Sequence, residues 1–197
     1  MKKGLIITLA VTGGVIILSI LILVIMGITS YNGFVDGEET LKEKQSTISV
    51  QLQRRADLIP NFVETVKGYS DYEQSTFLAV TEARTAVMKA NNSGDAEDQA
   101  EANAKLDSAI DIWVNAITEA YPELKASEQY IALQDELAGT ENRIAVARKD
   151  YNDAASEYNK SIRKFPKNIF ASMFGFEQVE YFEASESANQ VPQVSFD

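Results

Sequence analysis

The residues best placed to do chemistry in this chain are charged side chains on otherwise apolar helix faces. In the stretch VQLQRRADLIPNFVETVKGY, residues 50–69, Arg55 interrupts a stripe of apolar residues that recurs at helical spacing. A guanidinium buried there without a partner is very costly, so it needs a carboxylate or must extend to solvent. Glu141 interrupts the stripe of a second long helix and is the expected counter-ion. Such a pair fixes the register of two helices more than it stabilises them.

Other polar residues accompany this pair. Arg148 shares the face of Glu141, with Asp57 or Glu64 as its expected partner, and Arg84 interrupts a third apolar stripe. The candidate cluster, which is structural or binds a partner, consists of Arg54, Arg55, Asp57, Asn61, Glu141 and Arg148. Structural pairing inside a bundle is the preferred interpretation. The alternatives are a polar groove that binds a partner or ligand, and acid–base catalysis by the carboxylates.

Composition excludes several other chemistries. The chain has no cysteine and no histidine, which rules out disulfides, histidine bases and most zinc sites. Its net charge of −11 argues against nucleic acid, because phosphate binding needs a cationic face. The acidic segment GDAEDQAE, residues 94–101, lacks the residue order of a calcium loop. No catalytic residue, cofactor or metal site is therefore predicted.

The N-terminal element is an apolar run. Leu5 to Ile28 would form a helix of roughly 36 Å, enough to cross a hydrocarbon core of about 30 Å. A cleaved signal peptide would have only about 7–15 apolar residues and a small-residue cleavage site, so an uncleaved single span is expected. Lys2 and Lys3 favour a cytoplasmic N-terminus with the body outside. Lys42 and Lys44 weaken that preference.

Four long helices are predicted after the span, over residues 38–68, 71–90, 100–120 and 127–164. Gly33 and Gly37 are expected to loosen the chain before the first of them, and Pro60 to kink or break it near residues 58–59. The stretch NNSGDAED, residues 91–98, is rich in turn formers and predicts a loop. Tyr121-Pro122 predicts the end of the third helix.

The fourth predicted helix has a heptad pattern typical of a coiled coil. Large residues recur every seven positions, with smaller ones at the companion positions: Leu137, Ile144, Tyr151, Tyr158 and Phe165, and Leu133, Thr140, Ala147, Ala154 and Ser161. The repeated Tyr-Asn pairs at 151 and 158 are interpreted as tyrosine rungs of the core. Residues 168–176 predict a short apolar helix or docking segment.

The fold class is therefore all-α, an N-terminal transmembrane helix followed by an elongated antiparallel bundle of about four long helices. The predicted domains are a membrane anchor over residues 1–30, a helical-bundle domain over 31–182, and a polar, disordered tail over 183–197.

Long strings in the chain resemble the bacterial LemA family. They are SYNGFVDGEE, VQLQRRADLIPNFVETVKGY and LQDELAGTENRIAVAR, within a resemblance that covers Tyr31 to about Ala184. The resemblance implies a bacterial single-span membrane protein whose body is a bundle of long antiparallel helices. It implies no catalytic residues. It leaves the topology open, because the family has been drawn with the body in the cytoplasm, opposite to the charge argument.

The expected function is a non-enzymatic scaffold, tethered to the bacterial inner membrane, that self-associates or docks other envelope proteins. The lipid bilayer, further copies of the chain and other envelope proteins are its expected partners, and nucleic acid is not. The alternative is a ligand-binding or sensor module that uses a polar groove around Arg55 and Glu141.

Overall fold

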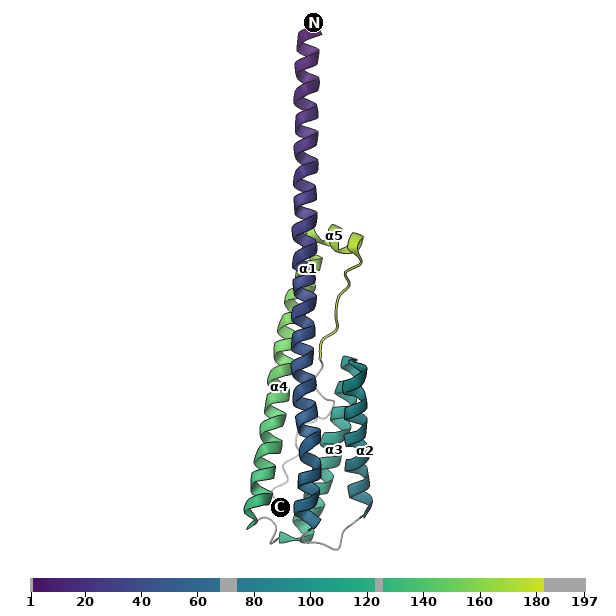
Figure 1. The fold of residues 1–197 in the computed structure, drawn as a ribbon, viewed down its shortest axis with the longest axis vertical. Helices are drawn as coiled ribbons and strands as arrows, with labels where there is room; N and C mark the ends of the chain where they lie inside the picture. Colours follow the sequence, from purple (N-terminus) through teal and green to yellow (C-terminus); the bar gives the residue numbers. More distant parts are fainter. Residues whose placement is uncertain (1, 68–73, 123–125, 183–197) are drawn as a thin grey trace, which may run out of the picture. The chain divides into compact units, whose positions relative to one another are not determined.

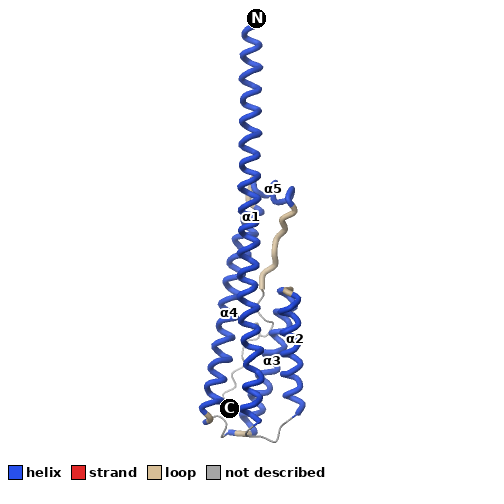
Figure 2. The backbone as a smooth tube through the Cα atoms, in the orientation of Figure 1, coloured by secondary structure: helices blue, strands red, loops and turns tan. Residues whose placement is uncertain are grey.

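The computed structural model describes residues 2–67, 74–122 and 126–182, and these residues contain helices and no strand. The helices are α1 (Lys2–Lys67), α2 (Gln74–Ser93), α3 (Ala96–Ala120), α4 (Glu128–Arg163) and α5 (Lys167–Phe174) (Figures 1 and 2). The all-α prediction is confirmed. The predicted last residues of the third and fourth helices are also confirmed, to within one residue. The predicted tail over 183–197 lies outside the described residues.

The chain divides into two compact units. The first, called here the anchor unit, comprises Met1–Lys42 and Asp153–Glu180; the second, the bundle unit, comprises Glu43–Asn152 and Tyr181–Asp197. Helices α1 and α4 contribute to both units, so the boundaries of these units do not follow helix ends. The division also differs from the sequence-based one, which placed a boundary at residues 30–31.

In the bundle unit, one apolar stripe from each helix forms the core. Helices α2 and α3 pack against each other (Figure 1), and Phe62 of α1 meets Trp113 of α3 and Tyr130 of α4 at ring-centroid distances of 5.0 and 5.4 Å. The buried core residues include Ile48, Leu52, Ile59, Val80, Val87, Leu106, Ile110, Ile117, Leu137 and Ile144. Within each helix these residues recur at steps of four or seven positions, as one face of a helix does.

Helix α1 runs without a break through the positions where the sequence suggested interruptions. Pro60 lies inside it, so the helix does not break near residues 58–59, and of the two predicted effects only a kink stays a prediction. Proline lacks the N–H that would bond the carbonyl of Ala56, four residues earlier. Arg84 of α2 supplies the missing donor, with its Nε 2.8 Å from that carbonyl oxygen. The neighbouring helix thus satisfies the group that proline leaves open.

The predicted loop over residues 91–98 is also shorter than expected. Helix α2 continues to Ser93 and α3 begins at Ala96, which leaves only Gly94 and Asp95 between them. Gly94 takes a positive φ of 71°, which glycine adopts readily. Asp95 caps α3 by accepting hydrogen bonds from the N–H groups of Glu97 and Asp98. Gly94 and Asp95 therefore form a tight turn that ends α2 and caps α3, and the other residues of the predicted loop are helical.

The heptad of α4 is buried over most of its length. Leu137, Ile144, Tyr151 and Tyr158 are all less than a tenth exposed, whereas Phe165 is 82 % exposed. The helix ends at Arg163, which leaves Phe165 beyond the periodic face.

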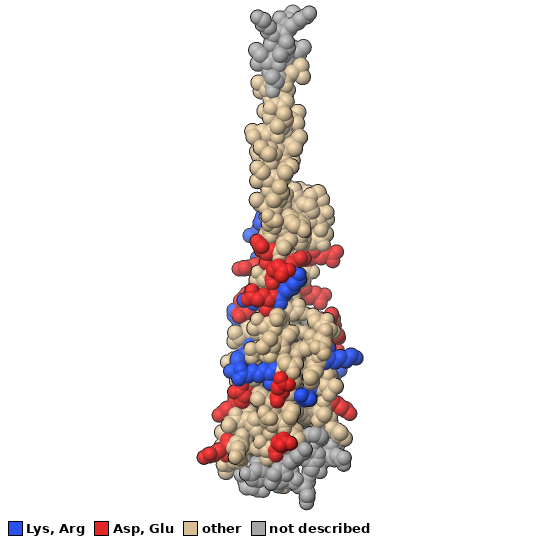
Figure 3. Space-filling model, viewed as in Figure 1, with Lys and Arg blue, Asp and Glu red and all other residues tan. Residues whose placement is uncertain are grey.

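In the anchor unit, the N-terminal part of α1 exposes its apolar side chains. From Leu9 to Ile25, and again at Ile28, the large apolar residues are about half exposed or more. Among the described residues, α1 is the one helix that is long and apolar enough to cross a membrane. Figure 3 shows this part of α1 free of charged side chains on the face drawn.

Farther along α1, Gly37 is helical and does not loosen the chain. A Cβ added to Gly37 would lie 2.8 Å from Cδ2 of Tyr158, so glycine permits the tyrosine ring to lie on the helix backbone. Tyr158 donates a hydrogen bond to Glu38 at 3.4 Å. Burial, together with the nearby Glu38 carboxylate, raises the pKa of Tyr158 to about 12.

Candidate functional site

The centre of the bundle unit contains a buried ion pair between α1 and α3. Arg55 is 4 % exposed, and its Nη1 contacts Oδ1 of Asp107. Asn103, one helical turn before Asp107, donates to the other carboxylate oxygen at 3.1 Å. The Asp107 side chain is 33 % exposed, so the pair has one buried member and one member that reaches solvent. Arg55 is thus neutralised inside the core, as its position on the apolar stripe requires.

The surroundings of Asp107 shift its protonation. Burial raises the pKa of Asp107 to about 6; Arg55 and Arg148 oppose the rise, and Glu141 and Asp111 add to it. The carboxyl is therefore ionised at neutral pH, where it balances Arg55. Burial also lowers the pKa of Arg148, against the attraction of Asp107.

Arg55 pairs with a carboxylate, as predicted, but the predicted partner Glu141 is wrong, because the carboxylate belongs to Asp107. Glu141 is exposed on α4, and it influences Asp107 through charge without an ion pair of its own among the described residues. The face of α1 that carries Arg55 meets α3 at this level, and α3 supplies the carboxylate. Sequence spacing showed that an acid was needed but not which helix would provide it.

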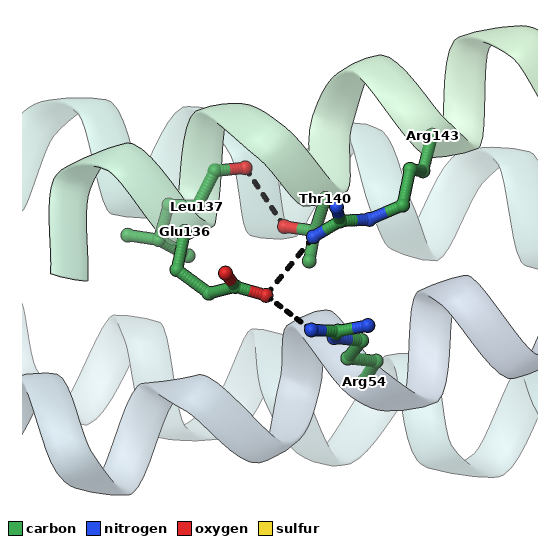
Figure 4. Close-up of polar contacts among 5 residues, drawn as sticks. All are labelled: Arg54, Glu136, Leu137, Thr140 and Arg143. Carbon is green, nitrogen blue, oxygen red and sulfur yellow. Dashed lines mark hydrogen bonds and ion pairs between the residues drawn. The ribbon is translucent and has the colours of Figure 1, made fainter. Parts of the chain in front are cut away.

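A second ion pair joins α1 to α4 nearer the surface. Glu136 accepts from Arg54 of α1 at 2.6 Å and from Arg143 of α4 at 2.9 Å, both through Oε1 (Figure 4). Thr140, fully buried beside this cluster, donates to the carbonyl of Leu137 at 2.7 Å. The Glu136 side chain is 36 % exposed and that of Arg54 is 53 % exposed, so this cluster is accessible and of modest energetic value.

The remaining predicted residues have different surroundings. Asp57 is exposed, accepts from Gln53 at 2.9 Å, and lies 3.9 Å from Arg84, so it does not serve Arg148. Asn61 is exposed on α1. Arg148 is half-buried, with its guanidinium carbon 5.9 Å from the ring centroid of Phe182. The six predicted residues therefore do not share one set of contacts: Arg55, Glu141 and Arg148 act on Asp107 through charge, whereas Arg54 pairs with Glu136 and Asp57 accepts from Gln53.

Other polar groups, of which Gln99 is buried, form a layer nearer the turn between α2 and α3. Gln99, 1 % exposed, donates to Oγ of Ser49 at 3.0 Å, and Asn91 donates to the Ser49 carbonyl at 3.2 Å. Gln45 donates to the carbonyl of Gly94 at 2.5 Å. These contacts tie α1 to the turn that joins α2 and α3. They position helices and present no nucleophile or acid–base pair.

Sequence reasoning missed Asp107 and Glu136 because each flanks an apolar stripe and does not interrupt one. The Asn103 and Asp107 spacing of four residues, on a helix with a charge-free stripe, was the available signal. Arg84 was noticed, but its role depends on Pro60, which lies on a different helix.

Two asparagines of α4 fix the chain that follows α5. In the anchor unit, the side-chain amide of Asn159 donates to the carbonyl of Val179 and accepts from its N–H, both at 2.9 Å. In the bundle unit, Asn152 makes the same two bonds to Phe182 at 2.8 Å. Each amide satisfies both backbone groups of one residue, as a strand partner would. The sequence predicted a role only for the tyrosines of the repeated Tyr-Asn pairs, as rungs of the core. In the structure the asparagines have a role as well, because they hold the chain that follows α5.

Comparisons with known proteins place the chain among bacterial relatives. A family model described as the LemA family matches residues 44–196. The magnetosome protein MamQ 2 of Paramagnetospirillum magneticum is 29 % identical over 190 residues, which cover 85 % of this chain and 70 % of the relative. MamQ of Magnetospirillum gryphiswaldense is 28 % identical over 90 % of this chain and 75 % of the relative. Protein LemA of Metamycoplasma hominis is 27 % identical over 79 % of this chain and 69 % of the relative.

Proposed function

The chain belongs to the LemA family, and we propose that it is a non-enzymatic, membrane-anchored helical scaffold that self-associates or docks partner proteins in the bacterial cell envelope. The observation that carries this proposal is the continuity of α1. One helix, Lys2–Lys67, provides the exposed apolar segment and then the central stripe of the bundle unit. The segment that would span the membrane is thus part of the same helix that contributes to the folded body.

The state of the polar cluster supports a scaffold over a sensor module. A ligand groove around Arg55 would need an accessible guanidinium, and this one is 4 % exposed and paired with Asp107. Arg54 is likewise engaged with Glu136. Buried pairs of this kind hold helices in register, which a scaffold requires. The names of the MamQ relatives refer to the magnetosome and not to a reaction, which also favours a structural role.

We place the chain in the inner membrane with a single span and the body outside the cytoplasm. Lys2 and Lys3 support this orientation. The cations of α4 and α5 follow far along the chain, outside the window of about 15–20 residues that the positive-inside rule counts. Two fusions at Asp197 test the side: alkaline phosphatase, active only outside the cytoplasm, and a fluorescent protein that matures only inside. Fluorescence without phosphatase activity would reverse the orientation.

Association is tested with the full chain in its native membrane. Because the chain lacks cysteine, single exposed residues of the bundle unit, Val146 and Ile131, can be changed to cysteine and crosslinked. Copies confined to a membrane reach high local concentration, so weak contacts suffice for capture. Disulfide-linked dimers or specific heteromeric products support the scaffold. A protein that resists alkaline extraction but stays strictly uncrosslinked at both positions would overturn it.

A further inference from the structure

Helix α5 of the anchor unit is apolar on two faces. One face packs on α1: a Cβ at Gly27 would lie 3.3 Å from the Phe170 ring, and the rings of Phe174 and Tyr31 have centroids 5.2 Å apart. The other face is open. Ile169 and Met173 are 57 % and 65 % exposed, and Phe165, four residues before Ile169, is also exposed. Ile169 and Met173 thus lie one helical turn apart on the open face of α5, and Phe165 is exposed in the turn that precedes the helix.

The position of α5 matches the end of the proposed span. Its contacts on α1 fall at residues 27–31, where the apolar run that begins at Leu5 ends. In Figures 1 and 2, α5 runs across the axis of α1 and not along it. A helix beside a span, at its end and perpendicular to it, has the geometry of a helix that lies in the membrane interface. In Figure 3 the region of α5 is tan and continuous with α1.

Cationic side chains surround the start of α5. Lys160, Lys164 and Lys167 line a hollow of about 480 Å³ together with the hydroxyl residues Thr29 and Ser161. Glu157 also lines it, yet none of the three lysines forms an ion pair with a residue in the described ranges. Arg163 adds a fourth exposed cation. The chain as a whole has a charge of −11, so this cluster is a local reversal of sign.

We propose that the outer face of α5 inserts into the bilayer surface and that the lysine-lined hollow binds the phosphate of an anionic phospholipid headgroup. The inference rests on the proposed membrane anchor and extends it from one span to a two-point attachment. The apolar residues supply burial in the acyl boundary, and the lysines supply attraction to anionic lipid. A second attachment restricts rotation and tilt of the anchor unit relative to the membrane.

The insertion is tested by site-directed spin labelling of the full chain in vesicles. Single-cysteine variants Met173→Cys, Ile20→Cys and Val146→Cys carry a nitroxide, and its collisions with oxygen and with a water-soluble nickel chelate report depth. We expect the label at 173 to be shielded from nickel, as the label at 20 is, and the label at 146 to be open. A label at 173 as open as that at 146, with the label at 20 shielded, overturns the inference. An open label at 20 instead overturns the anchor itself.

The headgroup site is tested by changing the charge of the lipids and measuring the shielding of the label at 173. In phosphatidylcholine vesicles that contain phosphatidylglycerol, the label at 173 should be shielded more strongly than in phosphatidylcholine alone. Each lysine near an anionic surface strengthens attachment about fivefold. The triple variant Lys160→Gln, Lys164→Gln, Lys167→Gln should therefore lose this dependence. Its control, Lys89→Gln, Lys105→Gln, Lys149→Gln, removes equal charge from the bundle unit and should keep it.

Two outcomes overturn the lipid assignment. One is equal shielding of the label at 173 in both kinds of vesicle. The other is a specific reversal of the phosphatidylglycerol effect by inorganic phosphate, beyond that of chloride at equal ionic strength, which would identify free phosphate as the occupant of the hollow.

Discussion

Arg84 Nε lies 2.8 Å from the carbonyl oxygen of Ala56, the group that Pro60 leaves without its backbone donor. The arginine therefore compensates for a proline on another helix. Arg84→Met should lower the free energy of unfolding by about 1–3 kcal/mol, because the carbonyl loses its donor. In a Pro60→Ala background the helix supplies its own N–H, and the same change should cost about 1 kcal/mol less.

The buried Trp113, the chain's one tryptophan, reports unfolding of the bundle unit by fluorescence during denaturant titration in micelles. Asp57→Asn is the control for the exposed ion pair with Arg84, and its effect should be below about 0.5 kcal/mol. An equal cost of Arg84→Met in both backgrounds would contradict the compensation.

Removal of Asp107 and removal of Glu141 should change stability by different amounts, because Arg55 pairs with Asp107 and not with Glu141. Asp107→Ala should lower the free energy of unfolding by roughly 2–3 kcal/mol, somewhat less than for a fully buried pair because Asp107 reaches solvent. Glu141→Ala, at an exposed position, should change it by less than about 0.5 kcal/mol. Trp113 fluorescence measures both. The reverse order would restore Glu141 as the counter-ion.

The stability of the bundle unit should depend on pH through Asp107. Its folded-state pKa of about 6 lies above the ordinary value of 3.8. The folded chain therefore holds this proton more tightly, and the resulting stability is complete below about pH 4 and lost as pH rises through about 6. Acidification from about pH 7 to about pH 5 should stabilise the wild type relative to Asp107→Asn. A relative loss of stability on acidification would show that attraction to Arg55 outweighs burial.

The contact of Gly37 with the ring of Tyr158 predicts opposite effects at two glycines of α1. Gly37→Ala places a Cβ 2.8 Å from Tyr158 Cδ2 and should destabilise the anchor unit by about 1–3 kcal/mol through overpacking. Gly33→Ala meets nothing within 4 Å and should be neutral or stabilising by up to about 1 kcal/mol. Thermal unfolding followed by circular dichroism distinguishes them. Equal effects at both positions would exclude a packing role for Gly37.

The amide of Asn159 should control the protection of the chain after α5. Asn159→Ala removes both bonds to Val179, so a glutamyl endopeptidase should cut after Glu177 and Glu180 several-fold faster. Asn142→Ala, at an exposed position of the same helix, is the matched control. Unchanged cleavage in Asn159→Ala would mean that the aromatic contacts of Phe176 with Tyr31 and Phe34 hold this segment alone.

Local sequence determined the helices, their apolar stripes and the apolar N-terminal segment. Periodicity needs only the residues of one helix, so Leu106, Ile110 and Trp113, or the heptad from Leu137 to Tyr158, could be assigned without any partner. The need for a counter-ion at Arg55 followed in the same way, from the high free energy of an unpaired buried charge.

Tertiary structure alone decided which groups meet. Asp107 pairs with Arg55, Arg84 donates to the carbonyl of Ala56, and the ring of Tyr158 lies on Gly37. The two residues of each pair come from different helices. The continuity of α1 through Gly37 and Pro60 has the same origin. Propensity penalties of about 1 kcal/mol for glycine and about 3 kcal/mol for proline are local, whereas the contacts that offset them come from α2 and α4. A periodic pattern specifies which face is buried, but not which neighbour covers it.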